Sequence, residues 1–482
     1  MITFLLSVVL LIGGYFIYGS FVEKVFGIDP KATTPAYSCT DGVDYVPMNW
    51  GKVFLIQFLN IAGLGPIFGA VMGATYGPAA FLWIVFGCIF GGAVHDYMSG
   101  MLSLRNNGMS LHGIGEKFMG KGFKNVVSVF TLLLMVLVGA VFIAGPAQLL
   151  ANLTPKSLDF TFWCVAIFIY YVLATLLPID KLIGKIYPFF GFALLFMAVG
   201  IFIGILVNDV TIPEAIPSNL HNMRTNADEF PIFPMLFISI ACGAISGFHA
   251  TQSPLMARCI KNEKIGKRVF YGAMIVEGLV ALIWAAAGMS FFGSAQGLQT
   301  FLDANGGNAA VVVDKISHAW LGKFGGVLAI IGVIAAPITS GDTAFRSARL
   351  IVADFFHISQ KPLRKRVSIA IPLFVVGFII LQINFDIIWR YFAWMNQTLA
   401  ASTLWVITVY LVNEKKCFWI SLIPALFMTM VVSTYIVVAP EGLSLPIQYG
   451  YLGGTICTVA IATFFCNWFI KHKKLNGSIA NI

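Results

Sequence analysis

Charged side chains are scarce in this chain of 482 residues. Only 11% of the residues are Asp, Glu, Lys or Arg, whereas soluble domains carry about 25%. This deficit excludes a soluble globular enzyme and a disordered protein. The net charge of +9 does not indicate a nucleic-acid partner, because the basic residues stand in short clusters between long apolar runs, as they do in the cytoplasmic loops of membrane proteins. The composition predicts a polytopic α-helical membrane protein surrounded by lipid.

A cysteine framework and a cleavable signal are also lacking. Of the eight cysteines, only Cys39 lies in a long polar loop, so we expect isolated thiols and no structural disulfides. The apolar run 1–21 has no basic leader, and its first charges, Glu23 and Lys24, follow it. A secretory signal has the opposite order. We therefore expect a retained helix whose N-terminus lies outside.

Thirteen apolar segments are long enough to be membrane spans. They are residues 1–21, 51–76, 78–104, 124–150, 158–178, 186–208, 232–257, 267–293, 323–350, 367–384, 388–412, 417–438 and 447–470. Alternating sides leave only Lys156, Arg224, Lys315, Lys323 and Arg390 of the 30 basic residues outside. Because basic residues accumulate in cytoplasmic loops, this predicts a cytoplasmic C-terminus. Two polar segments, 106–120 and 294–322, are expected to form a short interfacial helix and an outer hairpin.

Two of the predicted spans contain helix breakers near their middle. Gly63, Gly65 and Pro66 interrupt the first, and Gly243 and Gly247 interrupt the second. Proline removes a backbone donor, and unwound backbone at membrane depth persists only where it is buried in protein or lines a cavity. Each broken span is followed by four intact ones.

These breaks predict an inverted repeat. The chain divides into a helix at 1–22, a five-span repeat at 51–208, a second repeat at 232–412 and two further helices at 417–471. Five is an odd number, so the two repeats have opposite orientations, as in transporters whose discontinuous helices hold the substrate. The alternative is that glycines are simply common in membrane helices.

The residues at the two breaks are the candidate substrate site. The positive end of a half-helix can hold a substrate carboxylate through free backbone N–H groups. The candidates are Asn60, Gly63, Leu64, Gly65, Gly243, Ser246, Gly247 and Phe248.

Five ionisable residues fall inside the predicted spans. They are His95, Asp96, His249, Glu277 and Asp342. Such residues rarely face lipid. Counted from the inner end of its span, each lies about 12–15 Å deep at 1.5 Å per residue. We therefore predict one polar centre in the inner half of the membrane.

Three chemistries are open at that centre. Asp342 with Ser340 and Thr343 is expected to handle a coupling cation, and His95, Asp96, His249 and Glu277 are expected to relay protons, because histidine titrates near neutral pH. Sodium is the rival, since the hydroxyls and the broken-helix carbonyls are oxygen ligands. Zinc held by His95, Asp96, His249 and Asp342 is the third. A structural pairing of Asp342 with Arg346 remains an alternative for that residue.

Several segments resemble the carbon starvation protein A family. They are DGVDYVP (41–47), AGLGPIFG (62–69), GGAVHDYM (91–98), ACGAISGFHATQSP (241–254) and TSGDTAFRSARLIVADF (339–355). The resemblance runs along most of the chain. It implies a peptide transporter, or a pyruvate carrier as in some relatives, of the amino acid–polyamine–organocation superfamily with a LeuT-type five-plus-five fold. Many members are longer at the C-terminus and differ after GFHA, where this chain has TQSP.

Together these features predict a secondary active transporter of the bacterial inner membrane and not an enzyme. It would import small peptides or a small carboxylate such as pyruvate by alternating access, coupled to protons, with sodium coupling as the alternative. An intramembrane metal-dependent hydrolase is the reading from a different class, although the H-E-x-x-H motif is lacking. No cofactor is certain, and the sequence does not predict the oligomeric state.

Overall fold

The computed structural model describes residues 1–42, 44–176, 179–208, 210–356, 358, 362–383 and 385–479, and their regular structure is helical throughout. The α-helices are α1 (Ile2–Phe16), α2 (Tyr18–Phe26), α3 (Pro35–Ser38), α4 (Trp50–Ile61), α5 (Ala70–Ala74), α6 (Ala79–Phe86), α7 (Ala93–Arg105), α8 (Leu111–Met119), α9 (Lys121–Leu153), α10 (Phe160–Leu176), α11 (Ile179–Val207), α12 (Ile232–Ser239), α13 (His249–Ala257), α14 (Gly272–Phe291), α15 (Ala295–Ala304), α16 (Ala309–Phe355), α17 (Leu363–Ile380), α18 (Phe385–Asn413), α19 (Trp419–Val438) and α20 (Ile447–Ile479). Three π-helical stretches, η1 (Gly65–Gly69), η2 (Gly87–Gly92) and η4 (Lys267–Tyr271), and one 3₁₀ turn, η3 (Glu263–Ile265), join some of them.

The described residues contain nine helices that are long and apolar enough to cross a membrane, or ten if the bent pair α4 and η1–α5 is one span. Thirteen were predicted. Three of the predicted spans are not long or apolar enough to be counted. Helix α10 has 17 residues, the first turn of α17 contains Arg364, Lys365 and Arg366, and α12 is separated from α13 by non-helical backbone. By length and composition the chain is a multi-pass membrane protein.

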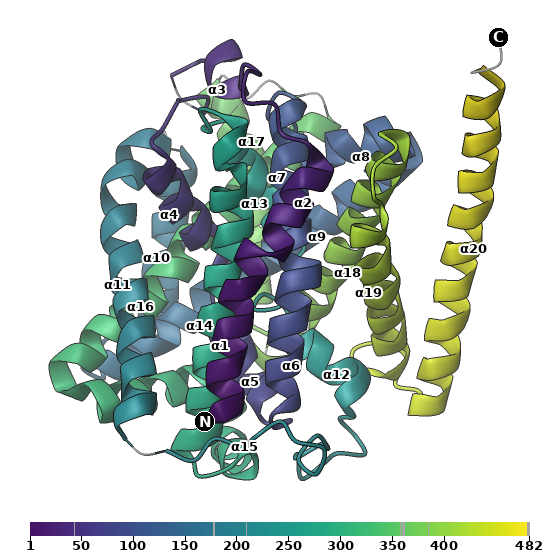
Figure 1. The fold of residues 1–482 in the computed structure, drawn as a ribbon. Helices are drawn as coiled ribbons and strands as arrows, with labels where there is room; N and C mark the ends of the chain where they lie inside the picture. The colour runs from purple at the N-terminus through teal and green to yellow at the C-terminus, as the bar shows by residue number, and fades with distance from the viewer. Residues whose placement is uncertain are drawn as a thin grey trace.

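The membrane helices form two sets of contacts, which are joined because α11 and α16 both lie against α4 and α11 lies against α14. In the first, α9 lies against α10, α16 and α17, and α11 lies against α16. In the second, α14 lies against α4, α5, α6 and α7, and α13 lies against α4 and α7. Helix α1 packs on α14 and α6, while α19 connects α18 to α20 at the edge of the bundle (Figure 1).

The loops gather at two opposite ends of the bundle. The N-terminus and α15 lie at one end, and α3 and α8 lie at the other (Figure 1). At the first end, the backbone N–H of Thr3 donates to Glu214 of the 210–231 loop at 2.6 Å. At the second end, Arg105 pairs with Glu263 at 2.9 Å and donates to the carbonyl of Gly27 at 2.6 Å. The N-terminus and the 210–231 loop, which were predicted to share a side, therefore do so, and so do the segments around Gly27, Arg105 and Glu263.

Both predicted helix breaks are present. After α4 ends at Ile61, the chain resumes at Gly65 with its axis bent by 56°. After α12 ends at Ser239, the backbone stays irregular until α13 begins at His249. The second break starts three residues before the predicted Gly243.

The two broken helices touch where they are unwound. A Cβ atom on Gly65 would lie 2.3 Å from Sγ of Cys242, and one on Gly69 would lie 2.7 Å from the carbonyl oxygen of Ser239. Such distances leave no room for a side chain. Glycine at these positions therefore permits the close approach of the two breaks.

The two polar segments fold as short helices. The 106–120 segment contains α8, as predicted. The 294–322 segment forms α15 and the first turns of α16, which kinks at Gly322, where φ is +67°. All eight cysteines are described, and none forms a disulfide.

Candidate functional site

Asp96 lies at the centre of a buried polar cluster beside the second break. Its Oδ1 is 2.8 Å from Nδ1 of His95, and its Oδ2 is 2.8 Å from Nδ1 of His249. All three side chains are fully buried. His95 and Asp96 stand in the first turn of α7, directly after the π-helical stretch η2. A π-helical turn shifts the residues that follow it around the helix axis, and such turns are frequent at functional sites.

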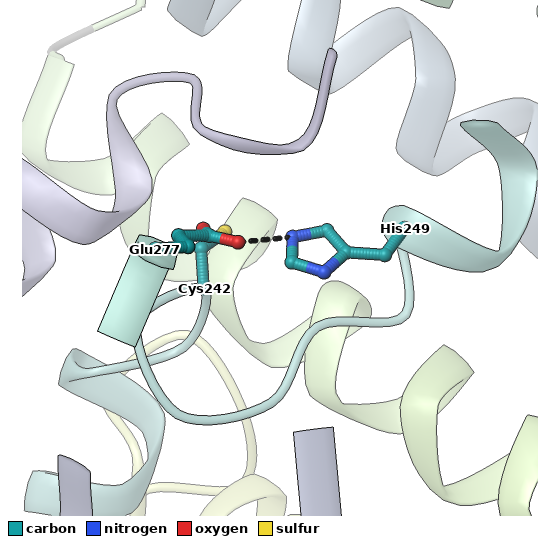
Figure 2. Close-up of side chains that lie close together, drawn as sticks. All are labelled: Cys242, His249 and Glu277. Carbon is teal, nitrogen blue, oxygen red and sulfur yellow. Dashed lines mark ion pairs between the residues drawn. The ribbon is translucent and has the colours of Figure 1, made fainter. Parts of the chain in front are cut away.

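His249 joins this cluster to α14. It is the first residue of α13, so the end of the break sets the position of its ring. Its Nε2 lies 3.4 Å from Oε2 of Glu277 (Figure 2). Within the described part of the chain, neither His249 Nε2 nor either carboxylate oxygen of Glu277 has a hydrogen-bond partner. The 3.4 Å contact therefore joins two groups that could each take a further ligand.

Cys242 completes the cluster from within the break. Its Sγ, a ring nitrogen of His249 and a carboxylate oxygen of Glu277 lie within 4.8 Å of one another. The sequence prediction treated Cys242 as an isolated thiol in an apolar run. The available signal was its position seven residues before His249, at the other end of the same break.

Asn396 of α18 holds the second break in shape and was not predicted from the sequence. Its Oδ1 accepts from the backbone N–H of Phe248 at 2.7 Å and from the hydroxyl of Ser246 at 3.1 Å. Its backbone carbonyl accepts from the N–H of Gly247 at 3.2 Å. These donors were predicted to hold a substrate carboxylate. In this structure the N–H groups of Gly247 and Phe248 are already used, because the protein supplies its own acceptor.

The first break lies against α16. The hydroxyl of Ser340 is 3.1 Å from the carbonyl oxygens of both Leu59 and Asn60, at the end of α4. Thr343 donates to the carbonyl of Ser340 at 2.8 Å. Asn60 is 2% exposed, and its Oδ1 has no partner among the described residues.

The remaining candidate substrate residues are buried in apolar packing. A Cβ atom on Gly63 would lie 2.5 Å from the ring of Phe142, and Leu64 fills the space beside Gly145. Gly243 lies against Ala281. The structure thus has the residues of both breaks covered by side chains.

Asp342 does not join the four other ionisable residues. It is 1% exposed and lies 3.9 Å from Arg346, one turn along α16. Arg346 also donates to the carbonyl of Ala174 at 3.0 Å. Across the described residues, no hydrogen bond or ion pair connects Asp342 to the cluster around Asp96. Asp342 therefore has no direct contact with this cluster among the described residues, and the single polar centre of all five residues stays a prediction.

The predicted set of zinc ligands does not come together as a whole. His95, Asp96 and His249 are in contact, but Asp342 contacts Arg346 and not these three. The side chains whose ligand atoms converge are Cys242, His249 and Glu277.

Comparison with known proteins identifies relatives along most of the chain. The family model described as "Carbon starvation protein CstA" matches residues 1–159, 147–317 and 286–435. An "uncharacterized membrane protein" of Haemophilus influenzae is 45% identical over 352 residues, which cover 63% of this chain and 95% of that protein. The peptide transporter CstA of Bacillus subtilis is 26% identical over 529 residues, covering 89% and 88% of the two chains. The pyruvate/proton symporter BtsT of Escherichia coli is 28% identical over 324 residues, covering 54% and 45%.

The fold also has a solved counterpart. The structure of MhsT in complex with L-phenylalanine matches with a TM-score of 0.56 at 14% sequence identity, covering 83% of this chain and 98% of MhsT. MhsT has the LeuT fold, so the expected fold type is confirmed at the level of overall architecture. Because the family model matches the chain from residue 1 to residue 435, the chain belongs to the carbon starvation protein CstA family.

Proposed function

We propose that this protein is a secondary active transporter that imports small peptides or a small carboxylate such as pyruvate across the bacterial inner membrane. The observation that carries the proposal is the contact between two helix breaks, at Gly65 and Cys242, inside a fold of the LeuT type. Discontinuous helices of this kind surround the substrate in transporters. In this proposal α10, α12 with α13, and α17 complete thirteen spans in two inverted repeats. The N-terminus lies outside and the C-terminus lies in the cytoplasm.

The proposed substrates share a carboxylate. A hollow of about 360 Å³ lies over the ends of α5 and α12, at the same end of the bundle as the N-terminus. Arg224 and Arg390 are among its lining residues. Arg390 is paired with Glu441 at 3.1 Å, so the guanidinium of Arg224 is the group that favours an anion at the entrance. From there the substrate would pass to the breaks when the side chains of Phe142 and Phe248, whose ring centres are 6.0 Å apart, separate.

Proton coupling is assigned to Asp342. Its carboxylate is buried on α16, two residues after Ser340, which bonds the carbonyls at the end of α4. Because side chains two residues apart on a helix do not face the same side, the Asp342 carboxylate faces α10 rather than α4. The charged groups facing it are Arg346 and Arg349 of its own helix, and Tyr170 of α10 is the facing titratable group. Proton binding would neutralise the carboxylate in one state of the cycle.

Sodium coupling is the second candidate, and one observation favours it. The hydroxyl oxygen of Ser340 lies 3.1 Å from the carbonyl oxygens of Leu59 and Asn60 at the first break, and the hydroxyl of Thr343 bonds the carbonyl of Ser340. Hard cations are bound by oxygen ligands of this kind.

Uptake by purified protein in proteoliposomes tests the proposal. Labelled dipeptides and labelled pyruvate are offered under an imposed proton gradient, an imposed sodium gradient, or neither. We expect accumulation above the external concentration with the proton gradient. Accumulation driven only by sodium would favour the second candidate, and equilibration without accumulation would exclude active transport. Recovery of the dipeptide as free amino acids, with no accumulation, would instead indicate the hydrolase.

A further inference from the structure

We propose that Cys242, His249 and Glu277 bind one divalent transition-metal ion, with Zn²⁺ as the best match. The three ligand atoms lie within 4.8 Å of one another, and each side chain is at most 2% exposed (Figure 2). Zinc is bound by Cys sulfur, His nitrogen and carboxylate oxygen, at about 2.3, 2.0–2.1 and 2.0–2.2 Å. This proposal concerns metal binding alone and is independent of the proposed transport.

The distance between His249 and Glu277 already suits an ion between them. Two ligand atoms of a tetrahedral zinc site, bonded at these lengths, are about 3.4 Å apart. Nε2 of His249 and Oε2 of Glu277 are 3.4 Å apart. The sulfur of Cys242 lies within 4.8 Å of both atoms, and its rotation toward the ion would break only weak hydrogen bonds of 3.5 Å with Ser246 and Asn396.

Asp96 orients the histidine for this role. Its Oδ2 accepts from Nδ1 of His249 at 2.8 Å, so the proton sits on Nδ1 and the lone pair of Nε2 points toward Glu277. Metal-binding histidines commonly donate their other ring N–H to a carboxylate in this way. His95 bonds the other oxygen of Asp96 at 2.8 Å, which fixes the carboxylate in turn.

The atoms that would bind the ion are those with unused bonding capacity. Nε2 of His249 and both carboxylate oxygens of Glu277 are buried and have no hydrogen-bond partner within the described residues. Buried polar atoms are rarely left in this condition. A divalent ion satisfies the nitrogen and the carboxylate, and its charge is balanced by the carboxylate and the thiolate. The thiol proton is released to solvent when the ion binds.

The elements that supply the ligands indicate a structural role for the ion. Cys242 and His249 lie at the two ends of the second break, Glu277 lies on α14, and the orienting Asp96 lies on α7. Helices α7, α13 and α14 belong to the same packing group, and none of the ligands comes from α9, α11 or α16. The ion therefore clamps the break to α14.

Metal analysis of the purified full chain tests this proposal. We expect mass spectrometry of the protein, purified in detergent without a chelator, to find one zinc per chain. After a chelator has removed it, Co²⁺ should restore binding and give the near-ultraviolet absorption band of a thiolate–cobalt bond. A folded protein that holds no transition metal and takes up neither Zn²⁺ nor Co²⁺ would overturn the proposal, and so would bound Co²⁺ without the thiolate band.

Variants assign the ligands. Cys242→Ser and Glu277→Gln keep the size of each side chain and should weaken Zn²⁺ binding about 100-fold or more, while Asp96→Asn should weaken it about 10–100-fold. The matched control is Cys259→Ser, because Cys259 is also buried but bonds the carbonyls of Asp44 and Leu255. Folding of each variant is checked by gel filtration. Wild-type affinity in folded Cys242→Ser and Glu277→Gln would contradict the assignment. Absence of transport by wild-type protein that binds the metal would count against the proposed function alone.

Discussion

Nδ1 of His249 lies 2.8 Å from a carboxylate oxygen of Asp96, although 153 positions separate the two residues in the chain. This bond ties the first turn of α13 to the first turn of α7. A histidine that follows nine residues of irregular backbone, 240–248, would otherwise have a poorly defined ring position. The Asp96 carboxylate fixes that position, and the geometry at Glu277 depends on it.

Gly65→Ala should destabilise the protein and abolish transport. The added Cβ would stand 2.3 Å from Sγ and Cβ of Cys242, and inserting a methyl group into such a contact costs about 1–3 kcal/mol. Thermal unfolding in detergent and uptake in proteoliposomes measure the two effects. Gly122→Ala is the control, because a Cβ at Gly122 on α9 has nothing within 4 Å. Equal stability of the two variants would contradict the close approach of the breaks.

Asn396→Ala should unfold at lower temperature than the wild type and transport more slowly. The substitution removes the acceptor for the backbone N–H of Phe248 and for the hydroxyl of Ser246. Leaving a buried donor unsatisfied costs about 1–3 kcal/mol. Asn305→Ala, at an exposed position after α15, is the matched control and should behave like the wild type. Unchanged unfolding of Asn396→Ala would show that the break does not depend on this side chain.

Local chemistry explains what the sequence predicted well. Glycine and proline act on their own backbone, so the unwinding near Pro66 and Gly243 followed from the residues themselves. His95, Asp96, His249 and Glu277 were predicted together because a thin apolar slab leaves few depths at which ionisable side chains can meet. The distribution of basic residues predicted that the N-terminus and the 210–231 loop lie at the same end of the bundle.

Rotation and long-range pairing explain what the sequence did not predict. The depth of Asp342 was estimated from its position along the span, but nothing in one sequence fixed the face of α16 that carries it. Asn396 stood within an apolar span, where its partner 148 positions away could not be inferred. Cys242 was taken as an isolated thiol, because the irregular backbone that brings it toward His249 has no regular geometry to extrapolate.

Labelling from one side of the membrane should show the 210–231 loop outside and the α18–α19 turn in the cytoplasm. Ser218 and Cys417 are both exposed. In intact cells, a membrane-impermeant maleimide should label Ser218→Cys in a Cys417→Ser background and should label Cys417 only after permeabilisation. The basic residues, of which 25 lie on the predicted inner side, drive this orientation. The reverse labelling pattern would overturn the proposed topology and the outside position of the N-terminus.

The attachment of α1 to the 210–231 loop should withstand moderate acid. Burial alone would raise the pKa of Glu214, but hydrogen bonds from the Met1 amino group and from Thr3 outweigh it and lower the pKa to about 2. Because the folded pKa is depressed from its usual value of about 4.3, the contribution to stability is present above the usual pKa and is lost as the pH falls toward about 2.

Hydrogen exchange at the amides of residues 2–6, corrected for its intrinsic pH dependence, measures this attachment. Protection should stay constant from about pH 8 to 5 and decline only at lower pH. Glu214→Gln removes the charge and should reduce protection throughout the range. Loss of protection in the wild type between pH 7 and 5 would contradict the depressed pKa.

Asp342→Asn should abolish gradient-driven accumulation and leave substrate exchange largely intact. A charge near the bilayer centre costs about 2.5–3.5 kcal/mol even on a lenient scale, so the carboxylate requires a cation or an internal partner, and a coupling proton or sodium ion supplies one. The amide mimics the neutral form and keeps the shape, so the substrate would still bind. Uphill uptake and counterflow in proteoliposomes separate the two properties.

Arg346, 3.9 Å from Asp342, provides the competing explanation. If Asp342 serves only to pair with Arg346, the amide leaves a buried guanidinium without its counter-charge, and Asp342→Asn should be poorly stable while its folded fraction still accumulates substrate. Asp159→Asn, at an exposed position before α10, is the control for loss of a carboxylate. A stable Asp342→Asn protein that accumulates substrate as the wild type does would rule out the coupling role, because no other carboxylate among the described residues lies in hydrogen-bond or ion-pair contact with Asp342 to replace it.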